Sequence, residues 1–313
     1  MKVDEYEHAP VLVSEVEQGL NIQADGIYVD CTFGRGGHSK VILRNLNDKG
    51  KLFVFDRDPE AVKIARQLAS HDSRVTAVHS AFSKFSDYLK SENLTGLVNG
   101  ILFDLGVSSP QIDDPKRGFS FVLSGELDMR MDPTSGIAAR EWLNQSEESD
   151  ISDVLRKFGE EKFSRRIARA IVEHRQIKPI STTQELSEII TDAVPFPDKH
   201  KHPATRTFQA IRILINDELE ELKTGISEAY NLLAEHGRLV VISFHSLEDR
   251  IVKRFFRELS KNDPYPQDLP VTADRIKPEL KIVGKLIKPS DRECDLNPRA
   301  RSAKLRIAEK LVT

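Results

Sequence analysis

The sequence predicts an α/β fold with a mostly parallel sheet and an inserted helical region. Two observations indicate the sheet. Short apolar, β-prone runs alternate with helical patterns, and three such runs end in a carboxylate, at Asp30, Asp56 and Asp104. The third observation is a change of pattern between residues 113 and 205, where helical periodicity prevails. We therefore expect a discontinuous α/β domain of residues 1–112 and 206–313 and an inserted helical domain of residues 113–205.

A glycine-rich turn follows the first predicted strand. A short helix ending at Leu20 precedes this strand, which covers residues 27–29 and closes at Asp30. The next three glycines let the backbone adopt positive φ and let a ligand approach main-chain N–H groups: Gly34, Gly36 and Gly37. A helix over residues 41–46 would present its positive end to the same ligand. A tight turn without a ligand is the alternative for this pattern taken alone.

The second strand favours a nucleoside ligand. Residues 51–55 are β-prone and end at Asp56, a carboxylate that can accept hydrogen bonds from ribose hydroxyls. The glycine spacing departs from the dinucleotide pattern G-x-G-x-x-G, and the phosphate-binding loop G-x-x-x-x-G-K-[ST] does not occur. The pattern Asp30-x-x-x-Gly34-x-Gly36 resembles instead the first motif of class I S-adenosylmethionine-dependent methyltransferases.

The third and fourth strands bring further side chains to the same sheet edge. Asp58 is predicted to cap the intervening helix. Phe82 follows a strand over residues 75–79, and its spacing alone favours a core aromatic over a ring that packs on a purine. The fourth strand ends at Asp104, where class I enzymes that methylate exocyclic amines carry an Asp/Asn/Ser-Pro-Pro-aromatic motif. The match is partial, because the next proline is Pro110.

The inserted region combines helical periodicity with positive charge. Phe163, Ile167 and Ile171 recur at helix spacing. The same stretch carries cations with few acids among them: Lys162, Arg165, Arg166, Arg169 and Arg175. Phosphate contacts explain this cluster, and a solvated helix face is the competing interpretation.

The remaining chain returns to the sheet. Helices are expected over residues 208–222 and 226–233, the second ended by Gly237, before a strand over residues 238–244. A Ser/His/Asp hydrolase site after this strand has little support, because no G-x-S-x-G motif occurs there. A strand-to-helix junction capped by Ser246 is favoured. The last strand follows a basic loop, which contributes Arg299, Arg301 and Lys304.

The composition is typical of a soluble cytoplasmic enzyme. Lys and Arg total 46 against 49 for Asp and Glu, and the net charge of −3 excludes a globally basic nucleic-acid-binding protein but not local basic patches. The two cysteines, Cys31 and Cys294, form no Cys-x-x-Cys pair, so we expect neither disulfides nor a cysteine-ligated zinc site, and we predict no metal. Neither a signal peptide nor a membrane span is expected. The sequence does not determine the oligomeric state, and a dimer is one of the alternatives.

Seven motifs together resemble one family. They follow the family's order and span nearly the whole chain: His8-x-Pro10-Val11-Leu12, Asp30-x-Thr32-Phe33-Gly34-Arg35-Gly36-Gly37-His38-Ser39, Asp56-Arg57-Asp58-Pro59, Asp104-Leu-Gly-Val-Ser-Ser-Pro-Gln111, Leu127-Asp-Met-Arg-Met-Asp-Pro133, Ser243-Phe-His-Ser-Leu-Glu-Asp-Arg250 and Asn297-Pro-Arg-Ala-Arg-Ser302. On these motifs the sequence is identified as a member of the bacterial small-subunit ribosomal RNA methyltransferase H family, also called the MraW family.

The resemblance implies a class I, Rossmann-like methyltransferase domain interrupted by a helical domain. It implies transfer of a methyl group from S-adenosylmethionine to the exocyclic N4 amine of one cytosine in 16S ribosomal RNA, within the small ribosomal subunit. It also implies a set of cofactor contacts: Gly36, Gly37, His38, Asp56, Phe82, Asp104 and Gln111. Spacing alone indicates the glycines and Asp56, whereas Phe82 and Gln111 come from the resemblance.

Asp104 is the candidate catalytic residue. The amine of cytosine is conjugated with its ring and is a poor nucleophile, so the enzyme must align its lone pair and accept an amine hydrogen. Asp104 or a main-chain carbonyl just after it is the candidate acceptor, and the cofactor contact of Asp104 competes with that role. The candidates for RNA phosphates are Arg165, Arg166, Arg169, Arg299, Arg301 and Lys304. Two alternatives stay open: a methyltransferase acting on DNA or protein, and a ribosome-assembly binding module with little turnover.

Overall fold

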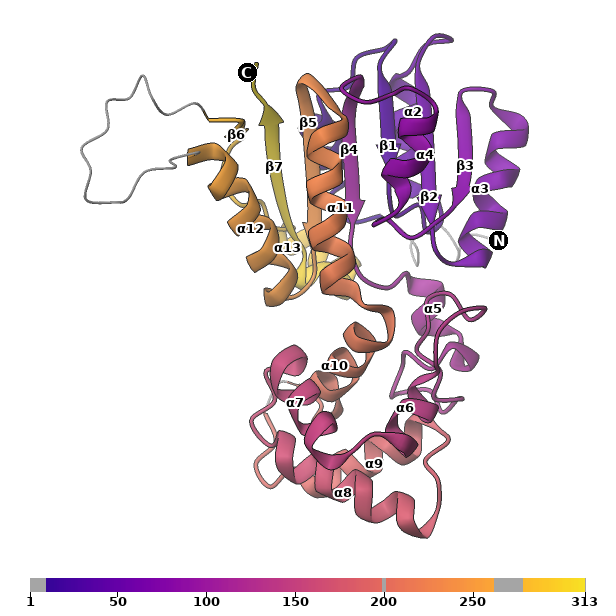
Figure 1. Cartoon of the computed structure of the whole chain (residues 1–313), viewed down its shortest axis with the longest axis vertical. Helices are drawn as coiled ribbons and strands as arrows, with labels where there is room; N and C mark the ends of the chain where they lie inside the picture. The colour runs from indigo at the N-terminus through magenta and orange to yellow at the C-terminus, as the bar shows by residue number, and fades with distance from the viewer. Residues whose placement is uncertain (1–9, 199–200, 262–277, 313) are drawn as a thin grey trace, which may run out of the picture. The chain divides into compact units, whose positions relative to one another are not determined.

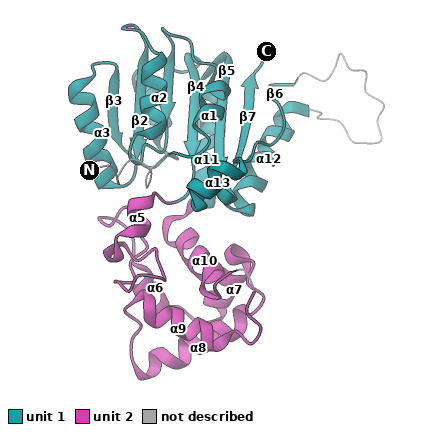
Figure 2. Ribbon diagram, turned by 180° about the vertical axis from the view of Figure 1, so that it is seen from behind, with its two compact units in different colours: residues 1–106, 219–313 teal, residues 107–218 magenta. Residues whose placement is uncertain are grey.

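The chain folds into two compact units. The computed structural model describes residues 10–198, 201–261 and 278–312, so His8 lies outside the described residues (Figure 1). One unit joins residues 1–106 to residues 219–313, and the other is residues 107–218 (Figure 2). The second unit is longer at both ends than the inserted domain predicted from the sequence, residues 113–205. At its C-terminal end the reason is packing, because Phe208 and Ile211 are buried in the core of this unit.

A seven-stranded sheet lies at the centre of the first unit, counted over the described residues. Its order is β3-β2-β1-β4-β5-β7-β6, in which β1 to β5 are parallel and β7 is antiparallel to both of its neighbours. The strands are β1 (Ile27–Asp30), β2 (Lys51–Asp56), β3 (Val75–His79), β4 (Val98–Asp104), β5 (Leu233–Ser243), β6 (Leu280–Ile282) and β7 (Lys304–Lys310). The prediction of a mostly parallel sheet is confirmed.

Apolar layers cover both faces of this sheet. Side chains alternate along the strands, so Phe53 and Phe55 of β2 face one layer and Leu52 and Val54 face the other. The first layer includes residues of α4 (Phe85–Ser91), α11 (Glu218–Leu232) and α12 (Ser246–Lys261), and Figure 1 shows the face that α11 and α12 cover. The second layer includes residues of α1 (Val13–Leu20), α2 (Gly37–Asn45) and α3 (Pro59–His71).

Local signals explain where these helices begin and end. Asp58 is the N-cap of α3 as predicted, and its side chain accepts a hydrogen bond from the N–H of Glu60 at 3.0 Å. The prediction that Gly237 ends the preceding helix is wrong, because α11 ends at Leu232. Gly237 lies inside β5, next to the point where the register between β4 and β5 shifts.

The second unit is helical. Its helices are α5 (Ser109–Asp113), the 3₁₀ helix η1 (Pro115–Arg117), α6 (Ala139–Gln145), α7 (Glu148–Gly159), α8 (Ser164–Ile177), α9 (Thr183–Ala193) and α10 (Ala204–Asn216). Ile167 and Ile171 of α8 are buried in its core, as the periodicity predicts. The single helix expected over residues 208–222 is instead split between α10 and α11, because Asp217 adopts the left-handed conformation with φ +50°.

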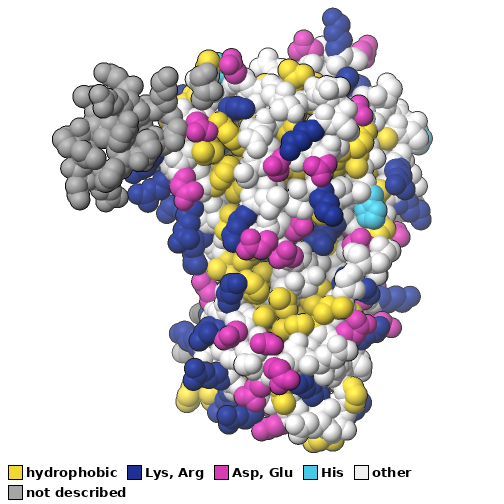
Figure 3. Space-filling view, in the orientation of Figure 1, with side chains coloured by type: hydrophobic (Ala, Val, Ile, Leu, Met, Phe, Trp, Pro, Cys, Tyr) yellow, Lys and Arg dark blue, Asp and Glu magenta, His cyan; other side chains and the backbone are white. Residues whose placement is uncertain are grey.

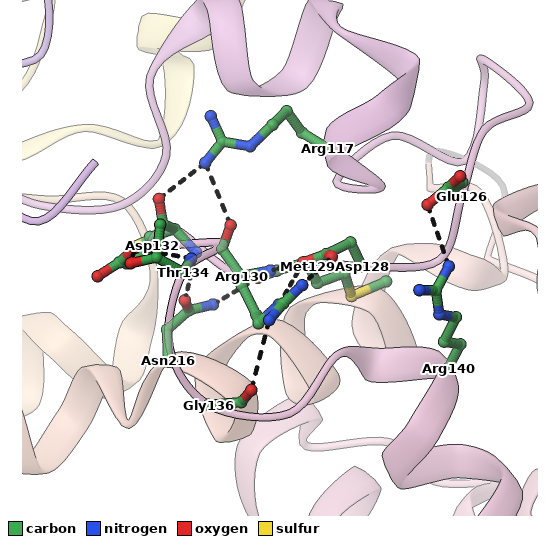
Figure 4. Close-up of polar contacts among 11 residues, drawn as sticks. Arg117, Glu126, Asp128, Met129, Arg130, Asp132, Thr134, Gly136, Arg140 and Asn216 are labelled. Atoms are coloured by element: carbon green, nitrogen blue, oxygen red, sulfur yellow. Dashed lines mark hydrogen bonds and ion pairs between the residues drawn. The ribbon is translucent and has the colours of Figure 1, made fainter. Parts of the chain in front are cut away.

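A polar network fixes one loop of the helical unit (Figure 4). Arg130 pairs with Asp128 through two contacts, Nε to Oδ1 at 2.9 Å and one terminal nitrogen to Oδ2 at 2.7 Å. Asn216 accepts the N–H of Met131 at 2.7 Å and donates to the carbonyl of Met129 at 2.7 Å. Met129 is fully buried with φ +61°, a backbone conformation that L side chains rarely adopt. The network therefore holds a strained loop in a single arrangement.

Replacing Asn216 by Ala is expected to lower the free energy of unfolding of the helical unit by about 2–4 kcal/mol, because a buried N–H and a buried carbonyl lose their partner. Trp142, the only tryptophan of the sequence, lies in α6, so its fluorescence reports chemical unfolding of this unit. The control is Gln176→Ala on an exposed position of α8, with an expected change below about 0.5 kcal/mol. A change for Asn216→Ala as small as that of the control would contradict the structural role of Asn216.

The surface carries charges of both signs. On the face shown in Figure 3, Lys and Arg are interspersed with Asp and Glu, in line with the net charge of −3. Any contact with a polyanion must therefore depend on local groups. Among the helices of the described ranges, none combines the length and apolarity needed to cross a membrane.

Candidate active site

Three carboxylates lie at the carboxyl edge of the parallel strands. Asp30, Asp56 and Asp104 are the last residues of β1, β2 and β4. The chain order of the strands reverses between β1 and β4, which are neighbours in the sheet. In open α/β sheets, such a reversal opens a crevice at the carboxyl ends of the strands, where ligands bind.

The glycine turn after β1 is tied to β2. The N–H of Gly34 donates to Asp56 Oδ2 at 2.8 Å. Gly36 has φ +75°, and a Cβ at this position would lie 2.7 Å from the ring of Phe33, so glycine is required on both counts. The turn leads into α2, whose first residues are Gly37 and His38. The two glycines and the histidine expected to contact the cofactor thus lie at the start of one helix.

The buried side chain of Asp30 stabilises the glycine turn through hydrogen bonds. Its buried carboxylate accepts the N–H of Thr32 at 3.1 Å and the hydroxyl of Ser39 at 2.6 Å, and burial raises its pKa. The hydroxyl of Thr32 in turn accepts the N–H of Asp104 at 2.6 Å. Asp30 was not among the predicted site residues, although its place at the end of β1 was the signal that could have indicated it.

Asp56 is an acceptor on both oxygens. Oδ2 accepts from Gly34, and Oδ1 accepts from the N–H of Asp58 at 2.8 Å. Burial raises the pKa of Asp56 to about 6 against the opposing effect of these two bonds. Each carboxylate oxygen has two lone pairs, so both oxygens keep capacity for a further donor such as a hydroxyl.

His38, which is buried, lies beside Asp104, which is half-buried. His38 is 5% exposed, and its Nε2 lies 3.5 Å from Asp104 Oδ2. Burial lowers the pKa of His38, but Asp104 and Asp30 outweigh this effect, so the pKa is raised above its ordinary value. Among the described residues, Asp104 Oδ1 and both ring nitrogens of His38 are buried without a hydrogen-bond partner. Such buried polar atoms need an explanation, and a bound polar ligand supplies one.

Phe82 and Gln111 have other contacts in the structure. Phe82, between β3 and α4, packs edge to face on Phe103 of β4 with ring centroids 5.7 Å apart. Gln111 belongs to the helical unit, where its side-chain oxygen accepts the N–H of Ser108 at 2.8 Å and caps α5. These contacts position both side chains, and a cofactor contact by either one stays a prediction.

The cations predicted to bind RNA differ in their surroundings. Arg165, Arg166 and Arg169 are exposed on α8, and Arg169 lies 3.9 Å from Glu148. Arg299 and Arg301 are exposed on the 3₁₀ helix η3 (Pro298–Ser302), which follows α13 (Asp291–Leu296). Lys304 begins β7 and pairs with Asp249 at 3.6 Å, so part of its charge is already compensated.

The Ser243–Arg250 motif is a strand-to-helix junction, as expected. Ser246 is the first residue of α12, and a cap formed by its side chain stays a prediction. Glu248 bonds main-chain N–H groups at the junction, because its Oε2 accepts from Phe244 at 2.8 Å and from His245 at 3.2 Å. Ser243 donates to the carbonyl of Lys304 at 3.4 Å. The motif therefore has a structural explanation that requires no hydrolase site.

The strand order, the glycine turn and the carboxylates at the ends of β1, β2 and β4 define a class I, Rossmann-like methyltransferase. The model of the MraW methylase family matches residues 5–311. The chain belongs to this family.

Solved structures resemble this chain at low sequence identity. An rRNA methylase from Streptococcus thermophilus is 12% identical, with 96% of this chain and 94% of that chain covered and a TM-score of 0.40. An O-methyltransferase from Thermotoga maritima is 11% identical, with coverage of 96% and 65% and a TM-score of 0.41. NSun6 from Pyrococcus horikoshii, solved with SFG, is 12% identical, with coverage of 100% and 56% and a TM-score of 0.43.

S-adenosylmethionine is the cofactor, and the residues at the sheet edge fit it. Asp56 retains acceptor capacity of the kind that ribose hydroxyls use. Asp104 Oδ1 and the ring of His38 are buried and lack hydrogen-bond partners among the described residues, so they can serve polar atoms of a ligand.

Proposed function

We propose that the protein methylates the exocyclic N4 amine of one cytosine in 16S ribosomal RNA, within the small ribosomal subunit. Membership of the MraW methylase family supports methyl transfer. The choice of an amine as the methyl acceptor rests on one observation. Asp104, at the end of β4, has one buried carboxylate oxygen that lacks a hydrogen-bond partner among the described residues. An amine must lose a proton when it gains a methyl group, and a carboxylate oxygen can take that proton.

Asp104 is proposed to act on the amine directly. S-adenosylmethionine, when bound, supplies an electrophilic methyl group on a sulfonium. The chain must hold the cytosine amine in line with that group and accept one of its hydrogens, because the lone pair is delocalised into the ring. Oδ1 of Asp104 would accept the hydrogen, while Oδ2 lies toward His38. Thr32 fixes the backbone of Asp104 and so positions the carboxylate.

The cofactor contacts are proposed to be those that the family implies. The side chain of Asp56 would accept hydrogen bonds from the ribose hydroxyls. Main-chain N–H groups of the turn before α2 would lie close to the cofactor. The full proposed set is Gly36, Gly37, His38, Asp56, Phe82, Asp104 and Gln111.

Cofactor affinity is expected to fall as the pH drops below about 6. Burial raises the pKa of Asp56 to about 6, so below that pH the carboxyl becomes neutral and loses acceptor capacity for ribose. If binding requires the carboxylate, the Kd rises by up to about tenfold per pH unit below the pKa. The pH dependence of stability has the opposite sign. The pKa of Asp56 is higher in the folded protein than in the unfolded chain, so this group adds to the free energy of unfolding at low pH, and the contribution is lost as the pH rises through about 6.

Calorimetric titration with S-adenosylhomocysteine between about pH 5 and 8 measures this dependence. The variant Asp56→Asn cannot titrate at this position, so it should bind weakly and without the same pH profile. A Kd for the unaltered protein that stays constant across the range would exclude Asp56 as the titrating contact.

RNA is proposed to contact exposed cations of both units. Arg165, Arg166 and Arg169 present positive charge on α8, and Arg299 and Arg301 do so on η3. Phosphate contacts of this kind hold an RNA without reading its sequence. They would keep the strand in place while the target cytosine leaves its stack to reach the site. Lys304 remains in this proposal, with a smaller contribution because of Asp249.

The test compares acceptors. Small ribosomal subunits from cells that lack this gene, DNA and total protein from the same cells are each incubated with labelled S-adenosylmethionine. Label in the RNA of the subunits is the expected result. Label in DNA or protein alone would support a different acceptor, and cofactor binding without any transfer would support a binding module.

A further inference from the structure

The helical unit contains a stacked pair of rings at its surface. Phe121 and His202 lie with ring centroids 4.7 Å apart and planes inclined by 17°. Phe121 also packs edge to face on Phe208, at 5.3 Å and 77°, and Phe208 is only 4% exposed. The pair is therefore anchored in the core at one end, while His202 belongs to the exposed residues.

The ring of His202 is held at two points. Besides the stack, its Nδ1 accepts the N–H of Ala204, the first residue of α10, at 3.2 Å. An acceptor at Nδ1 requires the proton of the neutral ring to be on Nε2. His202 is exposed as a residue, and Phe121 and Ala204 occupy one ring face and Nδ1, which leaves the other ring face and the Nε2 edge for a ligand. A planar ring with a fixed orientation thus faces solvent.

The segments that form this pair are basic. Residues 201–216 contain Lys201, Arg206 and Arg212 and no acid, although Arg212 is paired with Glu218 at 2.8 Å, and residues 115–125 contain Lys116 and Arg117 and no acid. Lys116 and Lys201 are exposed. Aromatic rings with neighbouring cations are the combination that single-stranded nucleic acids bind, since bases stack on the rings and phosphates lie near the charges.

We propose that His202, supported by Phe121, is a stacking platform for an unpaired base of the RNA substrate. This inference rests on the proposed function and adds to it a contact that depends on base stacking, not on charge. Stacking of one base on this ring is expected to increase RNA affinity roughly tenfold.

Two substitutions of His202 separate stacking from capping. His202→Phe keeps a ring on Phe121 and removes the acceptor for Ala204, whereas His202→Asn keeps a short acceptor and removes the ring. If His202 is a platform, His202→Asn weakens binding of small ribosomal subunits roughly tenfold and His202→Phe remains within about threefold of the unaltered protein. The Kd of S-adenosylhomocysteine should be the same in all three proteins, and any loss of stability in the unfolding curve of Trp142 fluorescence should be larger in His202→Phe, which removes the acceptor for Ala204.

The reverse order of effects would overturn the platform, because a larger loss in His202→Phe than in His202→Asn would assign His202 to capping alone. Unchanged subunit affinity in His202→Asn, together with normal methyl transfer by the unaltered protein, would also overturn the platform and leave the proposed function intact. If the unaltered protein neither binds nor methylates subunits, both proposals are wrong.

Discussion

Asp104→Asn is expected to lower kcat for methyl transfer by about 10²–10⁴-fold, the range that general acid–base catalysis contributes. The change removes the negative charge and keeps nearly the same shape, so the backbone contact from Asp104 to Thr32 should persist. Asp104 is also one of the seven proposed cofactor contacts, so the Kd of S-adenosylhomocysteine should rise, but only by about tenfold at most, because the amide keeps an acceptor oxygen and Asp56 and the glycine turn are untouched. Single-turnover kinetics and calorimetry measure the two quantities separately.

A matched control is Asp48→Asn, which alters an exposed carboxylate in the turn before β2. It should leave both kcat and cofactor affinity unchanged. If Asp104→Asn weakens cofactor binding as much as it lowers kcat, Asp104 is a cofactor contact only, and the proton acceptor must be sought elsewhere, for example among the carbonyls that follow it.

Reversing the charge of Arg165, Arg166 and Arg169 together is expected to weaken RNA binding by roughly 10²-fold or more at about 0.1 M salt. The three side chains are exposed on α8, so replacement by Glu should not disturb the core. The salt dependence of binding should also become shallower, by about one unit of log–log slope for each phosphate that the protein no longer neutralises. Filter binding of 16S RNA at several salt concentrations measures both effects.

The chain offers a control with the same spacing. Lys253, Arg254 and Arg257 are exposed on α12 and repeat the i, i+1, i+4 pattern of the α8 arginines. Changing these three to Glu alters the net charge equally. Equal loss of affinity in both triple variants would show only an effect of total charge, and α8 would then be an ordinary solvated helix face.

Local chemistry made the sheet and its edge predictable. The runs ending at Asp30, Asp56 and Asp104 are strands that end at these residues. Apolar residues need burial on both faces, whereas a carboxylate needs hydrogen-bond donors, which the turns after β1 and β2 supply to Asp30 and Asp56. Asp58 caps α3 because its side chain reaches an N–H of the first turn. Such signals involve neighbours in the chain, so they can be read from the sequence.

Contacts between distant segments could not be predicted in the same way. The partner of Lys304 is Asp249, on a different element, and no spacing rule connects them. The split between α10 and α11 depends on the left-handed backbone of Asp217, which the apolar periodicity does not show. The contact between His38 and Asp104 likewise depends on the strand order, which places the glycine turn next to β4. The family resemblance indicated both residues, but their geometry required the structure.

Identification of the methylated nucleoside tests the central claim most directly. Small ribosomal subunits from cells without this gene are methylated with the purified protein, and their RNA is digested and analysed by mass spectrometry against synthetic standards. N4-methylcytidine that forms with the unaltered protein and is lost with Asp104→Asn is the predicted result. A methyl group on a ring carbon, a ring nitrogen or a ribose would contradict transfer to an exocyclic amine and the role given to Asp104.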